Sequence, residues 1–270
     1  MKAKIIVDNI PDGAVCGEWG LCVYIEYRDK KILLDAGASG LFADNAEAYG
    51  IDLAEVDLAV LSHAHYDHAN GMEQFFRINS KADFYLRETA GENCYAKKYF
   101  FHKYIGLPRG ILEKYRDRIR FVSGDHALCD GAYLIPHKTP GLERVGKREK
   151  MFVRRGRVWL PDSFSHEQSL VFDTEQGLVI FNSCSHGGAG AIIREVRDTF
   201  PDKQVYALVG GLHLFNKSEQ ELREFAASLR ESGVRRVYTG HCTGKRAYEL
   251  LRSELGDVMH QFHVGLSMEF

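Results

Sequence analysis

Four segments of the chain share one plan, in which an apolar run rich in β-formers ends abruptly in a loop that carries histidine. Nearly continuous apolar runs bounded by glycine are typical of strands buried on both faces of a sheet. Strands that end in polar loops at one sheet edge are typical of α/β folds, and that edge is where such folds bind ligands. The four segments are Asp57–Ser62 before HAHYDH, Leu178–Asn182 before SCSHGG, Val205–Val209 before GGLHLF and Val234–Tyr238 before TGHCTG.

Amphipathic helices are expected after several of these loops. Ser218–Glu231 has apolar residues at helical spacing, and Ser218 followed by Glu221 is typical of a capping box at a helix start. Lys245–Leu255 has a second apolar stripe and is followed by Gly256, a common helix stop. A shorter helix is expected over Ala191–Phe200. The alternation of strand, loop and helix predicts an α/β fold.

Composition excludes several classes of function. The 35 Lys and Arg residues against 37 Asp and Glu leave a formal charge of -2, so no global positive field favours nucleic acid. No uncharged apolar run approaches the roughly 20 residues of a membrane-spanning helix. The six cysteines form no CxxC pair, which is typical of proteins from a reducing compartment. We expect a cytoplasmic protein whose partner is a small molecule, with no nucleic acid and no membrane.

One stretch departs from this alternation of strand, loop and helix. We expect a single domain over residues 1–270, with an insertion at about 88–162 that covers the site. An alternative is a solvated basic face over a small satellite core. The stretch begins with an aromatic cluster, which comprises Tyr95, Tyr99, Phe100, Phe101 and Tyr104. It ends with a basic run, which comprises Arg144, Lys147, Arg148, Lys150, Arg154, Arg155 and Arg157.

The segment His63-Ala64-His65-Tyr66-Asp67-His68 carries the strongest chemical signal. Three imidazoles and a carboxylate within six residues need partners for every ring nitrogen and for the charge when they are buried together. A divalent ion meets both needs, because imidazole nitrogen and carboxylate oxygen bind zinc-like ions. Residues two apart in an extended turn point to the same side. His63 and His65 are therefore predicted to bind one ion, and Asp67 and His68 to face a neighbouring position.

The pattern HxHxDH after an apolar strand, with Asp35 ending an earlier strand, resembles the metallo-β-lactamase-fold metallohydrolases. Further segments, among them DNI, CSHGG, GGLHLF and GHCTG, resemble the subfamily of the archaeal 7,8-dihydropterin-6-methyl-4-(β-D-ribofuranosyl)aminobenzene-5'-phosphate synthase. The resemblance implies a four-layer αββα sandwich, with two mixed β-sheets face to face and helices outside.

The resemblance also implies roles for individual residues. His63 and His65 would bind a first metal ion, and Asp67, His68 and His241 a second. Asp67 would in addition act in catalysis by orienting the hydroxide that the ions supply. Asp35 would steady the metal-binding loop through hydrogen bonds.

Two departures from the family pattern leave a ligand to be found. Many relatives carry a ligand histidine in a TPGH segment, but here Thr139-Pro140-Gly141 is followed by Leu142. Relatives also bridge the ions with an aspartate where this chain reads Asn182-Ser183-Cys184-Ser185-His186. We predict that His186 replaces the missing ligand. Cys184 is the alternative, as a thiolate, although a small buried apolar role suits it better.

These inferences predict a metal-dependent enzyme with one or two divalent ions, zinc first and manganese or iron as alternatives. It would activate water or a phosphate-bearing substrate, since metal ions lower the pKa of bound water from 15.7 to about 7. His213 is predicted to contact the substrate or a metal-bound oxygen in catalysis, and the alternative is a structural histidine. Arg144, Arg148 and Arg154 are predicted to hold the anionic group of the substrate. The remaining alternatives are a phosphoesterase or thioesterase of unrelated substrate, and a non-catalytic metal-binding module. His102, His126, His137, His260 and His263 match no motif and are expected to be structural.

Overall fold

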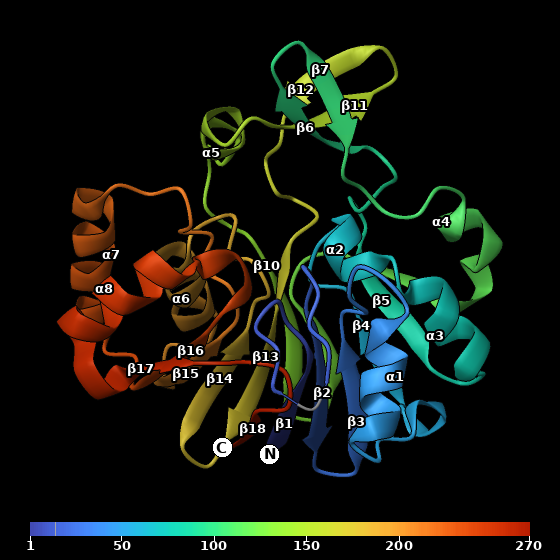
Figure 1. Ribbon diagram of the computed structural model, residues 1–270, viewed down its shortest axis with the longest axis horizontal. Helices are drawn as coiled ribbons and strands as arrows, with labels where there is room; N and C mark the ends of the chain where they lie inside the picture. Colours follow the sequence, from blue (N-terminus) through green and yellow to red (C-terminus); the bar gives the residue numbers. More distant parts are fainter. Residues whose placement is uncertain (14) are drawn as a thin grey trace.

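A computed structural model describes residues 1–13 and 15–270, in which two seven-stranded sheets lie face to face (Figure 1). The first sheet has the order β18-β1-β2-β3-β4-β5-β8 and the second has the order β17-β16-β15-β14-β13-β10-β9. The first comprises β18 (Ser267–Glu269), β1 (Lys2–Val7), β2 (Cys22–Tyr27), β3 (Lys30–Leu34), β4 (Leu58–Val60), β5 (Asp83–Arg87) and β8 (Ile119–Val122). The second comprises β17 (Met259–Gln261), β16 (Arg236–Thr239), β15 (Val205–Val209), β14 (Gly177–Phe181), β13 (Gln168–Thr174), β10 (Ala132–Pro136) and β9 (His126–Cys129).

Helices cover the outer face of each sheet, so the layers are those of an αββα sandwich (Figure 1). The expected fold is therefore confirmed. Near the first sheet lie α1 (Leu41–Ala48), α2 (Tyr66–Ala69), α3 (Met72–Ile78) and α4 (Ile111–Lys114). Near the second lie α6 (Ala189–Thr199), α7 (Glu219–Ser232) and α8 (Lys245–Leu255), and the short α5 (Glu143–Arg148) lies above them in Figure 1.

Three apolar clusters correspond to the three boundaries between layers. Ile25, Leu134 and Phe181 belong to the cluster between the two sheets. Phe42 and Phe75 belong to the cluster between the first sheet and its helices, and the side chains of α6, α7 and α8 pack onto the second sheet in the third cluster. Because both faces of each sheet are covered, its central strands are apolar almost throughout.

The helix predictions are confirmed to within two residues at each end. Ser218 caps α7: its side chain accepts a hydrogen bond from the Glu221 amide, and the Glu221 carboxylate accepts one from the Ser218 amide. Gly233 ends this helix in the left-handed conformation. None of the described helices is long and apolar enough to span a lipid bilayer.

A third, four-stranded sheet stands apart from the sandwich (Figure 1). Its order is β12-β11-β6-β7, with β12 (Val158–Pro161), β11 (Met151–Arg155), β6 (Cys94–Lys98) and β7 (Phe101–Tyr104). We call this sheet the cap. The expected insertion at 88–162 contains the cap strands at its two ends, while β8, β9 and β10 between them pair with the two large sheets.

The parallel halves of the two sheets position the histidine loops. Strands β3, β4, β5 and β8 are mutually parallel in the first sheet, and β14 to β17 are parallel in the second. Parallel strands end at a common edge, so the loops that follow β4, β14, β15 and β16 emerge together beneath the cap (Figure 1).

Candidate metal centre

Three histidines from two loops converge on one point. The rings of His63 and His65 are 4.6 Å apart, and the His186 ring is 5.0 Å from His63 and 4.8 Å from His65. The Nδ1 atom of His63 lies 2.8 Å from the Ser62 hydroxyl, which leaves Nε2 as the free nitrogen of that ring. One nitrogen from each ring lies within 4.8 Å of the others, so the three side chains can hold one metal ion.

Three further ligand atoms meet at a second point. The Nε2 atoms of His68 and His241 are 3.3 Å apart, and the Oδ2 atom of Asp67 lies 3.8 Å from the first and 3.6 Å from the second. Ligands bound at about 2.1 Å in a tetrahedral site lie about 3.4 Å from one another. The spacing of Asp67, His68 and His241 therefore fits a second ion.

The hydrogen bonding of the ring nitrogens tests whether metal ions fit. At the first point, Nε2 of His63, Nε2 of His65 and both nitrogens of His186 are buried without a hydrogen-bond partner among the described residues. At the second point, the Nε2 atoms of His68 and His241 face only each other and other ligand-type atoms. Burial lowers the pKa of His65 and His241 to about 3, and burial with neighbouring imidazoles lowers the pKa of His63 and His186. The rings are therefore neutral near pH 7, the form that binds metal ions.

A buried carboxylate holds the first loop. Asp35 accepts hydrogen bonds from the Ser62 amide and the Ser62 hydroxyl, both at 2.7 Å, and pairs with Nδ1 of His68 at 2.7 Å. Although burial opposes it, the carboxylates of Asp35 and Asp67 raise the pKa of His68. Asp35 thus fixes the ring and tautomer of His68, in the place that the family resemblance implies.

A second carboxylate holds the loop of His186. Glu167 accepts hydrogen bonds from the amides of His186 at 3.0 Å and Gly187 at 3.1 Å, and its other partner is the His137 ring. His137 also pairs with Glu195 at 3.0 Å, and these two carboxylates raise its pKa to about 9 against the effect of burial. His137 is therefore structural, as expected, but it belongs to the support of the metal centre.

A third carboxylate holds the loop of His241. Asp8 is fully buried, and its Oδ1 atom accepts a hydrogen bond from the His241 amide at 2.9 Å. Burial raises the pKa of Asp8 to about 7, while its backbone donors oppose the rise. The motif DNI marks this residue in the sequence, but no role followed from the motif alone.

His166 contacts the loop of His63 and His65 directly. The Ala64 amide, between His63 and His65, donates to Nδ1 of His166 at 3.2 Å. Nε2 of His166 lies 3.0 Å from Asp162, which follows cap strand β12. These two residues connect the cap to the metal-binding loop, a link that the sequence did not reveal.

Several loop residues at the centre have an unusual backbone. The φ values are 61° at Asp35, 51° at Ser185, 50° at His213 and 45° at His241. These values lie in the left-handed region, which residues other than glycine seldom adopt. Strained backbone of this kind is concentrated at functional sites, where surrounding contacts hold it.

Two buried cysteines lie at the base of the centre. The Sγ atom of Cys184 is 3.3 Å from Nε2 of His68 and 3.5 Å from Sγ of Cys242. Cys184 can join His63 and His68 in one ligand set, or His241 and Cys242 in another. Both candidates for the missing ligand, His186 and Cys184, are thus beside the other ligands.

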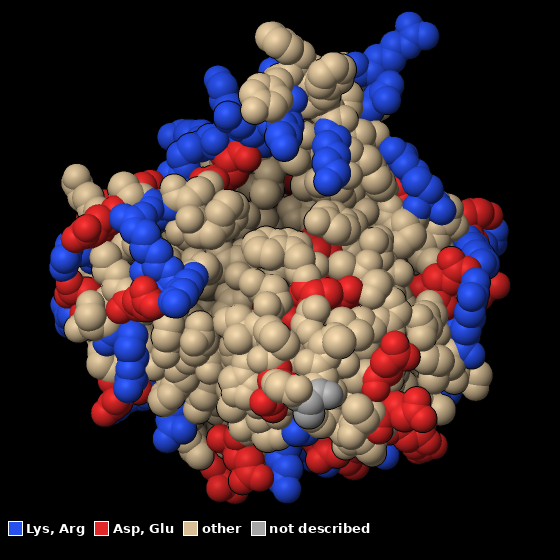
Figure 2. Space-filling model, viewed as in Figure 1, with Lys and Arg blue, Asp and Glu red and all other residues tan. Residues whose placement is uncertain are grey.

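A cavity of about 230 Å³ opens beside the centre, lined by His186, His213 and Arg148 among others. Lys and Arg gather over α5 and the cap, above a hollow in this face (Figure 2). Arg144 and Arg154 do not line the cavity, and the Arg154 guanidinium lies over the ring of Trp159 in the cap. Of the three arginines predicted to hold substrate, the structure brings Arg148 to the histidines.

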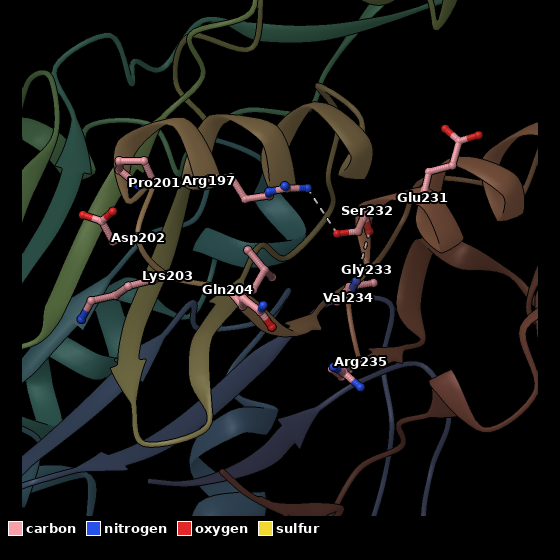
Figure 3. A pocket seen from close by; sticks show the side chains of 11 residues that line it. Arg197, Pro201, Asp202, Lys203, Gln204, Glu231, Ser232, Gly233, Val234 and Arg235 are labelled. Carbon is pink, nitrogen blue, oxygen red and sulfur yellow. Dashed lines mark hydrogen bonds between the residues drawn. The ribbon is translucent and has the colours of Figure 1, made fainter.

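The Leu142 position and a second cavity lie outside the ligand sets. Leu142 is buried at the start of α5. A larger cavity of about 720 Å³ lies between the end of α6 and the end of α7, where Arg197 donates to the Ser232 carbonyl (Figure 3). Its lining contains no histidine or cysteine, and β15 begins there, at the opposite end from the His213 loop.

Comparison with known proteins agrees with this geometry. The sequence model of the metallo-β-lactamase superfamily, which describes the family, matches residues 20–241 of this chain. The chain is 26% identical over 269 residues to the 7,8-dihydropterin-6-methyl-4-(β-D-ribofuranosyl)-aminobenzene-5'-phosphate synthase of Methanocaldococcus jannaschii, with 93% of this chain and 90% of that protein covered. It is 25% identical to an uncharacterised protein of the same archaeon, with 97% of each chain covered.

Solved structures share the fold. Tm1679, described as a metal-dependent hydrolase of the β-lactamase superfamily, superposes with a TM-score of 0.84 at 28% identity, over 100% of this chain and 99% of that one. A diphosphatase of the PhnP family superposes with a TM-score of 0.56 at 14% identity, over 100% of this chain and 97% of that one.

Proposed function

Because the chain belongs to the metallo-β-lactamase superfamily, we propose that it is an enzyme that uses one or two divalent ions to act on a small phosphate-bearing substrate. The observation that carries the proposal is the pair of adjacent ligand sets, His63, His65 and His186 beside Asp67, His68 and His241. Zinc is the first candidate, with manganese or iron as alternatives, because five of the six side chains offer imidazole nitrogen.

The proposed reaction assigns a task to each part of the site. Bound divalent ions lower the pKa of water and stabilise negative charge on a phosphate. The carboxylate of Asp67 faces both His68 and His241. It would orient the attacking oxygen by accepting a hydrogen bond from it. His213, whose ring is 4.4 Å from His186, would contact the substrate from the cavity side.

Three observations support an anionic substrate. Arg148 lines the cavity beside His186 and His213, and basic side chains surround the hollow on its cap side (Figure 2). Lys217 and Arg148 both pair with the buried Glu149 carboxylate in the same lining and neutralise it, although Glu221 and Glu224 also line the cavity. The synthase from Methanocaldococcus jannaschii is named for a phosphate compound.

We propose a cytoplasmic location as well, because six thiols without a disulfide suit a reducing compartment.

The test begins with metal analysis of protein purified without added metal. We expect one to two equivalents per chain, and loss of at least one equivalent in the double variant His63→Ala/His65→Ala. His126→Ala, a histidine on β9, is the matched control. Turnover is then compared on aryl phosphates, neutral esters and lactams. Full metal retention by the double variant, or equal rates on neutral and anionic substrates, would refute the proposal.

A further inference from the structure

Two large aromatic side chains stand half-exposed beside the metal centre. Trp19 is 45% exposed and Phe215 is 54% exposed, and their rings meet at 89° with centroids 6.5 Å apart. We call this pair the aromatic corner. Single exposed apolar residues are common on protein surfaces, so the corner gains meaning only from its surroundings.

The corner is continuous with the histidines of the centre. The Trp19 ring lies 4.9 Å from His241, and the Phe215 ring lies 5.2 Å from His213, which is itself 4.4 Å from His186. The aromatic rings therefore form an unbroken arc from one predicted ligand set to the other. The corner is the apolar, solvent-facing part of that arc.

The backbone around Trp19 is fixed. The Glu18 amide donates to the Asp8 carbonyl at 3.1 Å, and the Leu21 amide donates to the Asp67 carbonyl at 3.3 Å. A Cβ atom on Gly20 would lie 2.6 Å from that Asp67 carbonyl oxygen, so the close approach requires glycine. Trp19 is thereby held between the segment that supports His241 and the loop that carries Asp67.

The backbone around Phe215 is fixed as well. The Leu214 amide donates to the Cys242 carbonyl at 3.1 Å, which ties the two loops together. Gly244 has a φ of 78°, and a Cβ atom there would lie 3.1 Å from Phe215. Both aromatic side chains are thus positioned by the same loops that carry the metal ligands, before any substrate binds.

We propose that the aromatic corner is the binding site for a planar ring of the substrate, so that the enzyme acts on aryl or heteroaryl compounds. Two rings at a right angle fit a third flat ring, which stacks on one and meets the other edge-on. This inference rests on the proposed function of the metal centre, toward which the anionic group of the bound compound would point. In the aromatic cluster of the cap, Tyr95 packs against Tyr104 and Trp159, whereas Tyr99, Phe100 and Phe101 are exposed to solvent.

Fluorescence gives a readout of the corner that does not depend on turnover. The chain has two tryptophans, so the variant Trp159→Phe leaves Trp19 as the sole indole. This metal-loaded variant is titrated with phenyl phosphate and with cyclohexyl phosphate, which differ in the flatness of the ring. We expect saturable quenching by phenyl phosphate and about tenfold weaker binding of cyclohexyl phosphate, the size of one aromatic stacking contact.

The same preference is measured in variants of Phe215. Phe215→Ala should reduce the phenyl preference at least threefold, Phe215→Tyr should retain it, and Phe100→Ala, at the exposed tip between β6 and β7, should leave it unchanged. Metal content should be constant throughout. The Trp19→Ala variant, measured by calorimetry, should bind phenyl phosphate more weakly and bind cyclohexyl phosphate with unchanged affinity.

Four results would overturn the inference. The first two are absence of saturable quenching and an undiminished phenyl preference in Phe215→Ala. The third is Trp19 emission that changes with protein concentration, which would identify a contact between copies of the chain. The fourth is loss of metal from Trp19→Ala, which would show that Trp19 shields His241 and does not bind a ring. Binding of phenyl phosphate without any turnover would instead refute the proposed reaction and leave the ring site standing.

Discussion

Nδ1 of His68 lies 2.7 Å from Oδ2 of Asp35, and both side chains are completely buried. The pair directs the opposite nitrogen of the ring, Nε2, toward His241 and Asp67. A carboxylate that orients a ligand histidine commonly sets the affinity of a metal site without touching the ion.

The first prediction concerns this pair. Asp35→Ala should weaken metal binding at the site of Asp67, His68 and His241 by about 10–100-fold, because the His68 ring loses its orienting partner. Competition with a chromogenic chelator measures the affinity. Asp52→Ala, which removes the cap of a short surface turn, is the control. Asp35→Asn preserves the volume of the side chain, and unchanged affinity in both Asp35 variants would contradict the assignment.

The second prediction identifies the ligand that replaces the missing histidine. His186→Ala should reduce metal occupancy about as much as His65→Ala, because both rings contribute one nitrogen to the first ligand set. Cys184→Ser should have a mild effect. Elemental analysis of the three variants after dialysis decides between the two candidates. If Cys184→Ser releases metal while His186→Ala retains it, the thiolate is the ligand.

The third prediction concerns pH and the ion pairs of His137. The pKa of His137 is raised to about 9, so between the unfolded value near 6.5 and about 9 the folded chain binds more protons than the unfolded one. This contribution to the free energy of unfolding, on the order of 3 kcal/mol, is complete below about pH 6.5 and is lost as pH rises through about 9.

Urea unfolding of the wild type and His137→Gln measures this effect. Their difference in unfolding free energy should be largest near pH 6 and shrink toward pH 10. The pKa of Glu195 is lowered to about 2, so the same difference should also shrink as pH falls from about 4.5 toward 2. Parallel stability curves across the alkaline range would contradict the prediction.

The fourth prediction separates the arginines. Arg148→Gln should raise KM for an aryl phosphate about 3–10-fold at low ionic strength, because Arg148 lines the cavity beside His186. Added salt should reduce the effect, since Arg148 is exposed and screened. Arg154→Gln, in the cap, should change KM less. Equal KM values for Arg148→Gln and the wild type at low salt would show that the basic patch is merely solvated.

The sequence predicted the fold class, three of the helices to within two residues, and the candidate ligand residues of one loop. Apolar runs that end in histidine loops predicted the strands, and Ser218 with Glu221 predicted the start of α7. These signals are local, because hydrophobic periodicity and capping act over a few residues. HAHYDH is also local, since four side chains of the types that bind metal ions lie on one loop and need no distant partner to be recognised.

Only the tertiary structure decided which distant residues support and complete the centre. Asp8 lies 233 positions from His241 along the chain, and no spacing rule predicts that its carboxylate accepts the His241 amide. The link from Asp162 through His166 to Ala64, and the meeting of Trp19 with Phe215, likewise arise where separate loops pack together. Such contacts depend on sheet order and loop packing, which set the positions of side chains far apart in sequence.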